Sequence, residues 1–248
     1  MRIPMKIENK IAIVTGASSG IGRALAGLLS EKGARVALVA RSRDKLEALS
    51  KKIPHSLAVP ADMTVRADIE RAVNKTIDHF GGVDMLVNNA GRGYDAPVES
   101  IDIEEYRRTL ELNLIGPVIA MQLVIPEMRK RGGGSIVNVS SGTALMHLTN
   151  MSPYSSVKRA LAGISLTARE ELKKDNIIVS VLYPFITDTD FEKNTVKGDV
   201  VDESPEAGQK FTPDTPEYIA RRICEGIEAE EAEIFAHDWM KDLSGKAG

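Results

Sequence analysis

The chain has 248 residues, of which 43% are hydrophobic and 27% are charged, a composition typical of a soluble globular protein with a sizeable core. Its net charge of −3, with both signs interleaved, gives no electrostatic case for binding nucleic acid or an anionic membrane. The single cysteine, Cys224, excludes an internal disulfide and a cysteine zinc cluster, and it suits a reducing cytosol.

Membrane and targeting segments are not expected. No stretch approaches the roughly 20 apolar residues that span a bilayer, and residues 1–10 are too polar for a signal peptide. The expected location is therefore the cytoplasm. No metal site is predicted.

Short β-branched runs alternate with longer amphipathic segments along the chain. The runs that we expect to be strands are 11–16, 35–40, 55–61, 83–91, 134–141, 177–183 and 233–237. These runs are apolar almost throughout, which is typical of a sheet covered on both faces. Seven strands alternating with helices predict an α/β fold: a doubly wound, mostly parallel sheet with helices on both faces, forming one domain over residues 1–248.

The first predicted strand runs into a glycine-rich turn, TGASSGIG at 15–22, and a helix follows. Gly16, Gly20 and Gly22 let the backbone turn tightly. A pyrophosphate can then approach the helix N-terminus, where amide N–H groups and the helix dipole favour negative charge. A glycine-rich turn without a ligand is the alternative, but the strand before and the helix after favour a dinucleotide site.

Two arginines, Arg41 and Arg43, follow the second predicted strand. An acidic residue at this strand end would bind the ribose 2′-hydroxyl of NAD, whereas arginine accommodates the 2′-phosphate of NADP. The charge pattern therefore favours NADP(H) over NAD(H). A charged helix start is the alternative, and it suits Arg43 better than Arg41.

Polar residues follow the third and fourth predicted strands. Asp62 comes after the third, and Asn88-Asn89-Ala90-Gly91 closes the fourth. Both lie at the carboxyl ends of strands, the edge at which open α/β sheets bind ligands. Two amides followed by small residues leave room for an adenine ring or a ribose. The alternatives are capping of the next helix by Asp62 and an ordinary Asn–Gly turn.

Asn113 interrupts the apolar helix TLELNLIGPVIAM. A buried amide needs a hydrogen-bond partner, and a water chain toward Lys158 would provide one. A purely structural hydrogen bond is the alternative. Ser140 and Ser141 end the fifth predicted strand, at the edge where a substrate carbonyl would lie.

Tyr154 and Lys158 are four residues apart on a predicted helix, so their side chains are adjacent on one face. Moving the pKa of a tyrosine from about 10 to about 7 requires roughly 4 kcal/mol. A positive charge at about 4 Å supplies about that amount at an effective dielectric near 20. Lys158 is therefore predicted to lower the pKa of Tyr154 and make it a general acid. An ordinary exposed Tyr/Lys pair is the alternative.

The sixth predicted strand passes into Pro184, Phe185 and a Thr/Asp-rich segment, LYPFITDTD at 182–190. Residues 190–216 are then polar, rich in proline, glycine and charge, and lack periodicity. A connection this long inside a domain is usually functional or disordered. We interpret it as a lid that closes over the substrate.

Six motifs together resemble the classical short-chain dehydrogenase/reductase family, in order and approximate spacing, over essentially the whole chain. They are TGASSGIG (15–22), Asp62, NNAG (88–91), Asn113, Ser141 and YSSVK (154–158). The resemblance implies a Rossmann-like fold and an oxidoreductase that transfers hydride between NADP(H) and a carbonyl/alcohol pair. It also implies a homo-oligomer, a dimer or tetramer, formed through helices around 103–130 and 152–174.

The resemblance implies roles for individual residues. Tyr154 would be the general acid, Lys158 would lower its pKa and hold the nicotinamide ribose, Ser141 would bind the carbonyl oxygen, and Asn113 would anchor a relay water. The predicted cofactor contacts are Gly16, Ser18, Ser19, Gly20, Ile21, Gly22, Arg41, Asp62, Met63, Asn89, Ala90, Gly91, Tyr154, Lys158, Pro184, Thr187 and Thr189.

The chain departs from the family at Phe185, where the family usually has glycine. A phenyl ring adds bulk beside the nicotinamide, and an aromatic residue rarely tolerates positive φ. We expect Phe185 to narrow or reshape the substrate pocket. The candidate pocket residues are Tyr94, His147, Met151, Phe185 and Phe191, with His147 interpreted as a polar loop residue.

Two alternatives remain open. A non-catalytic NADP(H)-binding sensor or regulatory protein would keep the fold without turnover, since fold does not imply function. An enzyme with the same chemistry could also prefer NAD(H). The sequence does not specify the substrate or the preferred direction of the reaction.

Overall fold

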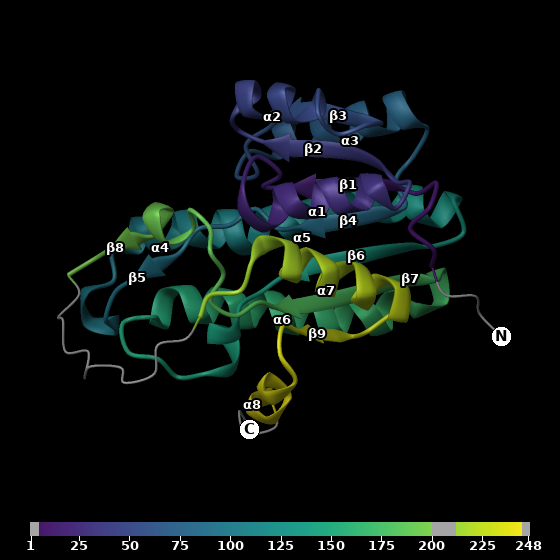
Figure 1. Ribbon diagram of the computed structural model, residues 1–248. Coiled ribbons are helices and arrows are strands. Elements are labelled where there is room, and N and C mark those ends of the chain that lie inside the picture. Colours follow the sequence, from purple (N-terminus) through teal and green to yellow (C-terminus); the bar gives the residue numbers. More distant parts are fainter. Residues whose placement is uncertain (1–4, 200–211, 245–248) are drawn as a thin grey trace.

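The computed structural model describes residues 5–199 and 212–244. Within them, a seven-stranded parallel sheet runs through the centre of the molecule in the order β3-β2-β1-β4-β6-β7-β9 (Figure 1). Its strands are β1 (Ile11–Thr15), β2 (Arg35–Ala40), β3 (Ser56–Pro60), β4 (Met85–Asn88), β6 (Gly134–Val139), β7 (Ile177–Tyr183) and β9 (Glu233–Phe235). This is the doubly wound, Rossmann-like architecture expected from the sequence, with each expected strand present.

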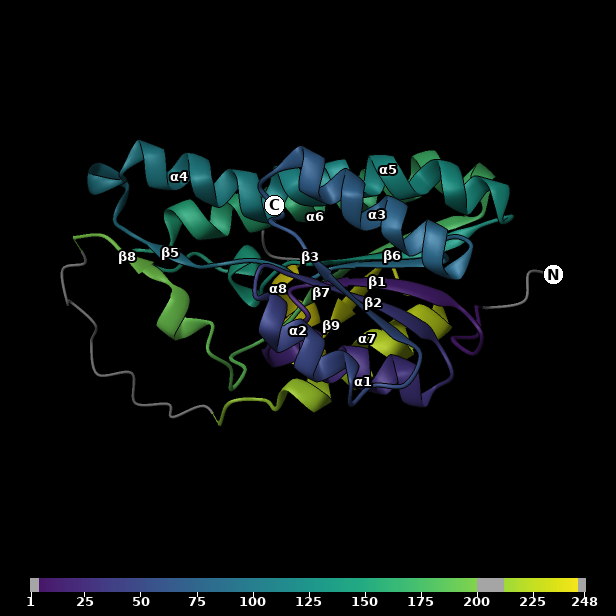
Figure 2. The same cartoon turned by 90° about the horizontal axis from the view of Figure 1, so that it is seen from above.

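Helices cover both faces of the sheet (Figure 2). One face carries α3 (Arg66–Phe80), α5 (Gly116–Lys130) and α6 (Ser152–Leu172), and the other carries α1 (Gly20–Glu31), α2 (Arg43–Ser50) and α7 (Pro216–Ala229). A short helix, α8 (Lys241–Ser244), follows β9. Apart from the edge strand β3, the strands are buried along almost their whole length, so each face of the sheet has its own apolar core. Continuous apolar strands have this arrangement because neither side of the sheet meets water.

The segment Ile103–Lys130 has the length and apolar character of a membrane span, contrary to the expectation that no such stretch exists. It comprises α4 (Ile103–Leu110), a π-helical turn (Glu111–Ile115) and α5. In the fold it is a core helix, because Met121, Val124 and Met128 of α5 are buried against the sheet. Its apolar character reflects this packing.

A second, two-stranded sheet was not expected from the sequence. β5 (Tyr94–Asp95) pairs in parallel with β8 (Val196–Lys197). Strands of two residues carry no readable periodicity, and this pairing joins segments about a hundred residues apart. It attaches the start of the predicted lid to the loop that follows β4.

The end of the predicted lid is also attached to the body of the protein. The Asp188 amide donates to the Asp214 carbonyl at 2.9 Å, and the Asp214 amide donates to the Ile186 carbonyl at 2.8 Å. Residues 200–211, the middle of the predicted lid, lie outside the described residues. Both flanks of that stretch therefore lie at the carboxyl edge of the sheet.

Candidate active site

The carboxyl ends of β1, β4, β6 and β7 meet at one edge of the sheet, and the glycine turn after β1 lies there. Gly16 and Gly20 have positive φ values of +68° and +50°. A Cβ atom on Gly22 would lie 2.4 Å from the Gly16 carbonyl oxygen, so no larger residue fits there without moving the backbone. The turn thus has the close backbone packing that a pyrophosphate cradle requires.

The N-terminus of α1 is suited to an anion. Its N-cap residue, Ser19, makes no side-chain capping hydrogen bond, and the first turn contains no acidic residue. The amide groups of a helix N-terminus and the helix dipole favour negative charge there. The residues present therefore fit the pyrophosphate of a dinucleotide.

Thr15, the last residue of β1, joins the glycine turn to the NNAG segment. Its hydroxyl oxygen accepts from the amides of Asn89 and Ala90 at 2.9 and 3.0 Å, and the Asn89 side-chain amide donates to the Thr15 carbonyl at 2.9 Å. Thr15 was not among the predicted site residues. A hydroxyl residue placed directly before a glycine turn is the signal that could have identified it.

Arg41 and Arg43 differ in their surroundings. Arg43 lies 3.6 Å from Glu47 in an i,i+4 ion pair on α2, which is the ordinary charged helix start. Arg41 is exposed at the end of β2, and within residues 5–199 and 212–244 it makes no ion pair. Its guanidinium is therefore available for an anionic group of a ligand.

Asp62 organises a turn and does not cap α3. Its carboxylate accepts from the amide and the hydroxyl of Thr64 at 2.9 and 2.8 Å, whereas the N-cap of α3 is Val65. The capping alternative was therefore wrong. Met63, predicted as a cofactor contact, has a buried side chain in the core under α5.

Tyr154 and Lys158 lie in the first two turns of α6, and both are almost fully buried, at 5% and 3% exposed. The Lys158 ammonium nitrogen lies 5.7 Å from the centre of the Tyr154 ring and donates to the Val139 carbonyl at 2.9 Å. The alternative of an exposed Tyr/Lys pair is therefore wrong.

The two serines at the end of β6 have different partners. The Ser140 hydroxyl donates to the Lys158 carbonyl at 2.8 Å, so it fastens α6 to β6. The Ser141 hydroxyl is near enough to Tyr154 to act on the pKa of the phenol, which it lowers. Ser141 also accepts from the amide and hydroxyl of Thr143, at 3.2 and 3.0 Å. These contacts leave the Ser141 proton available to point toward Tyr154.

Burial changes the two pKa values in opposite directions. Burial raises the pKa of Tyr154 well above its ordinary value, although the hydrogen bond from Ser141 acts to lower it. Burial lowers the pKa of Lys158 to about 7. The prediction that Lys158 by itself brings the pKa of Tyr154 toward neutrality was wrong for the protein alone, because burial disfavours the charged form of both groups.

Asn113 lies in the π-helical turn and is 0% exposed. Its amide nitrogen donates to the carbonyls of Arg92 and Thr109 at 3.0 and 3.1 Å, so the structural alternative is part of its role. Its side-chain oxygen is buried and has no hydrogen-bond partner among the residues that the structure describes. A Cβ atom on Gly91 would lie 2.6 Å from that oxygen and 3.5 Å from the Lys158 ammonium nitrogen. Asn113 and Lys158 therefore face the same spot beside Gly91.

The segment after β7 crosses the glycine turn and reaches Tyr154. The Gly142 amide donates to the Pro184 carbonyl at 2.8 Å, which fixes the start of the segment beside Ser141. A Cβ atom on Gly20 would lie 2.9 Å from the Thr189 methyl group, so Thr189 lies directly over the turn. The Phe191 ring lies 5.7 Å from the Tyr154 ring. The Thr187 hydroxyl donates within the segment, to the Phe185 carbonyl at 2.9 Å.

Phe185 keeps a negative φ, as expected for an aromatic residue. Its ring packs edge-on against Trp239 and His237 of the C-terminal segment, with ring centres 5.2 and 6.2 Å apart. Its expected effect on the substrate pocket stays a prediction. The ring contacts add a second role, because Phe185 supports the segment that follows β9.

The other candidate pocket residues have different environments. Tyr94 is buried in β5, and its hydroxyl oxygen accepts from the Asp102 amide at 2.7 Å, so it is held as a structural residue. His147 is exposed in a loop, which agrees with its interpretation as a polar loop residue. Met151 immediately precedes α6 and bridges to Ala96. Of the five candidates, Phe191 lies against Tyr154, with ring centres 5.7 Å apart.

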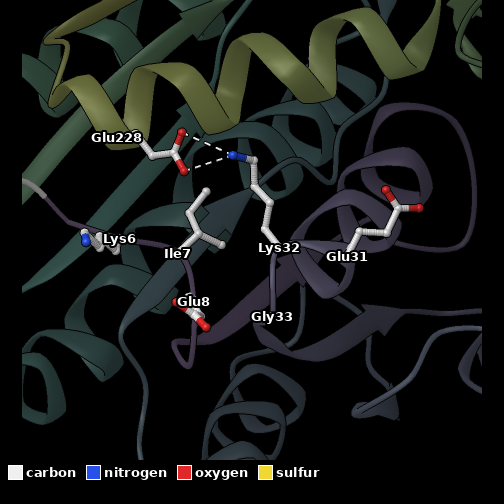
Figure 3. A pocket seen from close by; sticks show the side chains of 7 residues that line it. All are labelled: Lys6, Ile7, Glu8, Glu31, Lys32, Gly33 and Glu228. Atoms are coloured by element: carbon white, nitrogen blue, oxygen red, sulfur yellow. Dashed lines mark hydrogen bonds and ion pairs between the residues drawn. The ribbon is translucent and has the colours of Figure 1, made fainter.

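A groove lies at the opposite edge of the sheet, where β1, β2 and β9 begin (Figure 3). Its lining residues are Lys6, Ile7, Glu8, Glu31, Lys32, Gly33 and Glu228. The side chains of Lys32 and Glu228 point toward each other as an ion pair at 2.9 Å, so the central cation is already neutralised. The groove contains no acid–base pair like that of Tyr154 and Lys158, which lie at the other edge.

Comparisons with known proteins agree with this geometry. Residues 10–199 match the family model described as short chain dehydrogenase. An uncharacterised oxidoreductase of Staphylococcus epidermidis is 31% identical over 195 residues, which cover 78% of this chain and 85% of the relative.

Two solved structures are similar over nearly the whole chain. A 3-ketoacyl-(acyl-carrier-protein) reductase from Brucella melitensis, complexed with NADH, has 26% identity and a TM-score of 0.83, covering 93% of this chain and 98% of its own. A short chain dehydrogenase from Burkholderia cenocepacia, in complex with NADP, has 27% identity and a TM-score of 0.81, covering 97% and 93%. Similar structures therefore contain either nicotinamide cofactor.

Proposed function

This chain belongs to the short-chain dehydrogenase family, and from that premise we propose that it is an NADP(H)-dependent oxidoreductase that interconverts a carbonyl compound and an alcohol. Membership of the family shows an NAD(P)(H)-dependent oxidoreductase without specifying which of the two cofactors is preferred. The observation that carries the proposed carbonyl chemistry is the buried Tyr154 with Ser141 and Lys158 beside it, next to a glycine turn that fits a pyrophosphate.

Tyr154 acts as the general acid in the direction of carbonyl reduction. When bound, the nicotinamide supplies the hydride that goes to the carbonyl carbon. The Tyr154 hydroxyl donates its proton to the carbonyl oxygen, and its raised pKa keeps that proton in place until then. Ser141 holds the same oxygen with its own hydroxyl, which Thr143 orients by donating to the Ser141 oxygen.

Lys158 and Asn113 return a proton to Tyr154. Lys158 has a pKa of about 7, so it gains and loses a proton readily near neutral pH. The unpartnered oxygen of Asn113 faces the same spot as the Lys158 ammonium, which suits a bound water at that position. We assign to these residues the path by which a solvent proton replaces the one that Tyr154 donates.

The preference for NADP(H) rests on Arg41. This residue is exposed at the end of β2 without an ion pair in the described chain, whereas Arg43 is paired with Glu47. An unpaired guanidinium at this strand end suits a 2′-phosphate. The similar structures contain NADH in one case and NADP in the other, so they support both cofactors equally.

Three further features belong to the proposal. The exposed apolar side chains Ile103, Ile115 and Ile164 on the helices of 103–130 and 152–174 support a homodimer or homotetramer. The single cysteine is a buried thiol, which suits a reducing cytoplasm.

Residues 1–248 form one catalytic domain, in which 190–216 is a lid over the substrate. The contact of Phe191 with Tyr154 supports this role.

A cofactor-specific activity screen tests the proposal. Purified protein is offered a panel of ketones and aldehydes with NADPH and with NADH, alongside Arg41→Ala and the matched control Arg43→Ala. We expect turnover with NADPH, and a rise in its KM of about tenfold or more in Arg41→Ala, since losing a charged hydrogen bond costs about 1.5–3 kcal/mol. Arg43→Ala and the KM for NADH should change little.

Two results would contradict the proposal in different ways. NADH binding more tightly than NADPH, with no effect of Arg41→Ala, would overturn the cofactor assignment alone. NADPH binding without turnover of any carbonyl or alcohol in the panel would favour the sensor or regulatory protein.

A further inference from the structure

Asp95 is a carboxylate in β5, the short strand beside the start of α6, that the proposed reaction does not use. It is half-buried in β5, and within the described chain its carboxylate makes neither a hydrogen bond nor an ion pair. Burying a charged group without a partner costs free energy, so such a group usually has a function or a ligand. Its charge reaches the catalytic site, because it raises the pKa of Tyr154.

The fold holds Asp95 in place between the start of α6 and the predicted lid. The neighbouring Ala96 donates its amide to the Asn150 carbonyl at 2.7 Å and bridges to Met151, just before the helix that carries Tyr154. On its other side, the Asp95 carbonyl accepts from the Gly198 amide at 2.8 Å, beyond β8. Backbone contacts on both sides therefore fix the position of this carboxylate.

Strand geometry separates Asp95 from its neighbour Tyr94. Successive side chains of a strand point to opposite faces. The Tyr94 ring is buried toward Asp102, whose amide donates to the Tyr94 hydroxyl oxygen. Asp95 therefore points to the opposite side of β5, and the bridge from Ala96 to Met151 places this strand beside the first turn of α6, which carries Tyr154.

The other charged groups near Asp95 do not neutralise it. Lys197 lies opposite Asp95 in the β5–β8 pairing, but its ammonium is within 3.7 Å of Glu192. Burial first and Glu192 second raise the pKa of Asp95, and they outweigh Lys197, which acts to lower it. The surroundings of Asp95 thus favour a group that brings positive charge or a hydrogen-bond donor.

We propose that Asp95 is a substrate-binding residue, and that the enzyme prefers carbonyl compounds with a hydrogen-bond donor, a hydroxyl or an ammonium group, near the reacting carbon. The inference rests on the proposed carbonyl reduction. Phe191, against the Tyr154 ring, supplies the apolar side of the same site. Carboxylated substrates are disfavoured by like-charge repulsion, since Asp95 and Glu192 are both acidic.

A series of ketones of nearly equal size tests this proposal. The probes are 2-butanone, hydroxyacetone, aminoacetone and pyruvate, with homologues that carry the donor one and two carbons further out. kcat and KM are measured for the wild type, Asp95→Asn, Asp95→Leu and the control Glu192→Gln. Glu192 is an exposed acid next to Asp95, so its variant changes the local charge without removing the proposed contact.

We expect the wild type to prefer at least one donor-bearing ketone over its plain counterpart by about tenfold or more in kcat/KM, the size of a charge-assisted hydrogen bond. Asp95→Asn should lose the preference for the ammonium group while keeping part of that for the hydroxyl. Asp95→Leu should lose both. Both variants should still bind NADPH, and that binding shows that they are folded.

Other outcomes overturn the inference. An equal loss of kcat/KM for all ketones in Asp95→Asn would mean that Asp95 does not bind the substrate donor. The same changes in Glu192→Gln would mean that the negative charge of this region matters and not a contact with Asp95. Turnover of 2-butanone without any preference for donors would remove the inference and leave the proposed function intact. No turnover of any ketone, while nicotinamide nucleotide still binds, would overturn the proposed function and the inference with it.

Discussion

Tyr154 and Lys158 show how burial determines the protonation of a tyrosine hydroxyl and a neighbouring lysine amine. Their side chains are almost completely removed from water, and burial penalises the tyrosinate and the ammonium alike. The pKa of Tyr154 therefore rises and that of Lys158 falls to about 7. In the protein alone the stable state is a neutral tyrosine beside a lysine that is only partly charged at neutral pH. A proton donor for carbonyl reduction needs that neutral tyrosine.

The lowered pKa of Lys158 predicts a pH-dependent stability. Because the folded pKa, about 7, lies below the value of 10.5 for the unfolded chain, the unfolded state binds more protons between these values. This group's contribution to stability is full above pH 10.5 and is lost as the pH falls toward 7. Lys158→Met should therefore unfold less readily than the wild type at pH 7, by about 1–4 kcal/mol.

Urea denaturation of both proteins without nucleotide measures this difference. The advantage of Lys158→Met should shrink as the pH is raised toward 10. A variant that is less stable than the wild type by the same amount at both pH values would show that Lys158 is not destabilised by burial.

Most residues of the candidate site could be identified from the sequence, but their environments could not. The i,i+4 spacing of Tyr154 and Lys158 places them on one helix face, which periodicity alone predicts. Their burial depends on how α6 packs against β6, which local spacing does not contain. Thr15 was missed although it directly precedes the glycine turn, because its hydroxyl acts through Asn89 and Ala90, which only the fold brings near. Asp95 was also missed, since a two-residue strand has no sequence signature.

At the scale of elements, the glycine turn and α1 form one unit. The turn approaches the backbone of β1 and the NNAG segment so closely that side chains are excluded at Gly16 and Gly22. The uncapped N-terminus of α1 then faces the same edge as the end of β4. The glycine pattern predicts this unit well, since each glycine there has a steric reason.

A pair of glycine variants in α1 tests the steric argument. A Cβ atom on Gly22 would lie 2.4 Å from the Gly16 carbonyl oxygen, whereas nothing lies within 4 Å of one on Gly27. Gly22→Ala should lower the free energy of unfolding by about 1–3 kcal/mol and weaken NADPH binding. Gly27→Ala should raise it by about 0.5–1 kcal/mol and leave NADPH binding unchanged. Thermal denaturation and nucleotide titration provide both readouts, and equal effects of the two changes would contradict the account.

The segment after β7 is linked to the C-terminal segment through Phe185. Its ring packs against Trp239, the chain's only tryptophan, at 5.2 Å, and Trp239 is 44% exposed. The Asp214 carboxylate, near the end of the predicted lid at 190–216, lies 2.9 Å from the His237 ring nitrogen. Residues 185, 214, 237 and 239 therefore connect three segments that the sequence keeps apart.

Tryptophan fluorescence can report on this link. Phe185→Gly removes the ring that covers one side of Trp239, so we expect the emission to shift to longer wavelength. Phe80→Gly serves as the control, because Phe80 packs against His79 and Arg35 at the end of α3. An unchanged emission spectrum in Phe185→Gly would show that the ring contact does not persist in solution.

At the scale of the whole molecule, the order of strands and the two covered faces follow from the sequence pattern. Apolar strands of the right length, separated by amphipathic helices, predict a parallel doubly wound sheet, and the sheet has that form. The small β5–β8 sheet and the packed position of 103–130 depend on long-range contacts, so they required the structure.

The proposed oligomer gives a prediction at this scale. Ile164, on α6, is 38% exposed on one of the helices expected to form the interface. Ile164→Glu should place a charge in that interface and yield a smaller assembly, because an unpaired buried charge is costly. The control is Val65→Glu, which changes an apolar residue, 45% exposed, that precedes α3.

Light scattering coupled to size-exclusion chromatography gives the mass of each species. We expect a dimer or tetramer for the wild type and Val65→Glu. A wild type that is monomeric at every concentration tested would contradict the proposed assembly.

The central claim, that Tyr154 donates the proton in carbonyl reduction, is tested most directly by the turnover of Tyr154→Phe. The substrate is the best ketone found in the activity screen, with NADPH as cofactor. The matched control is Tyr106→Phe, which removes a tyrosine hydroxyl that lies 2.9 Å from the Ser156 hydroxyl outside the reaction centre. We predict a fall in kcat of roughly 10²–10⁴-fold in Tyr154→Phe, with NADPH binding retained and Tyr106→Phe active. Undiminished turnover in Tyr154→Phe would contradict the account.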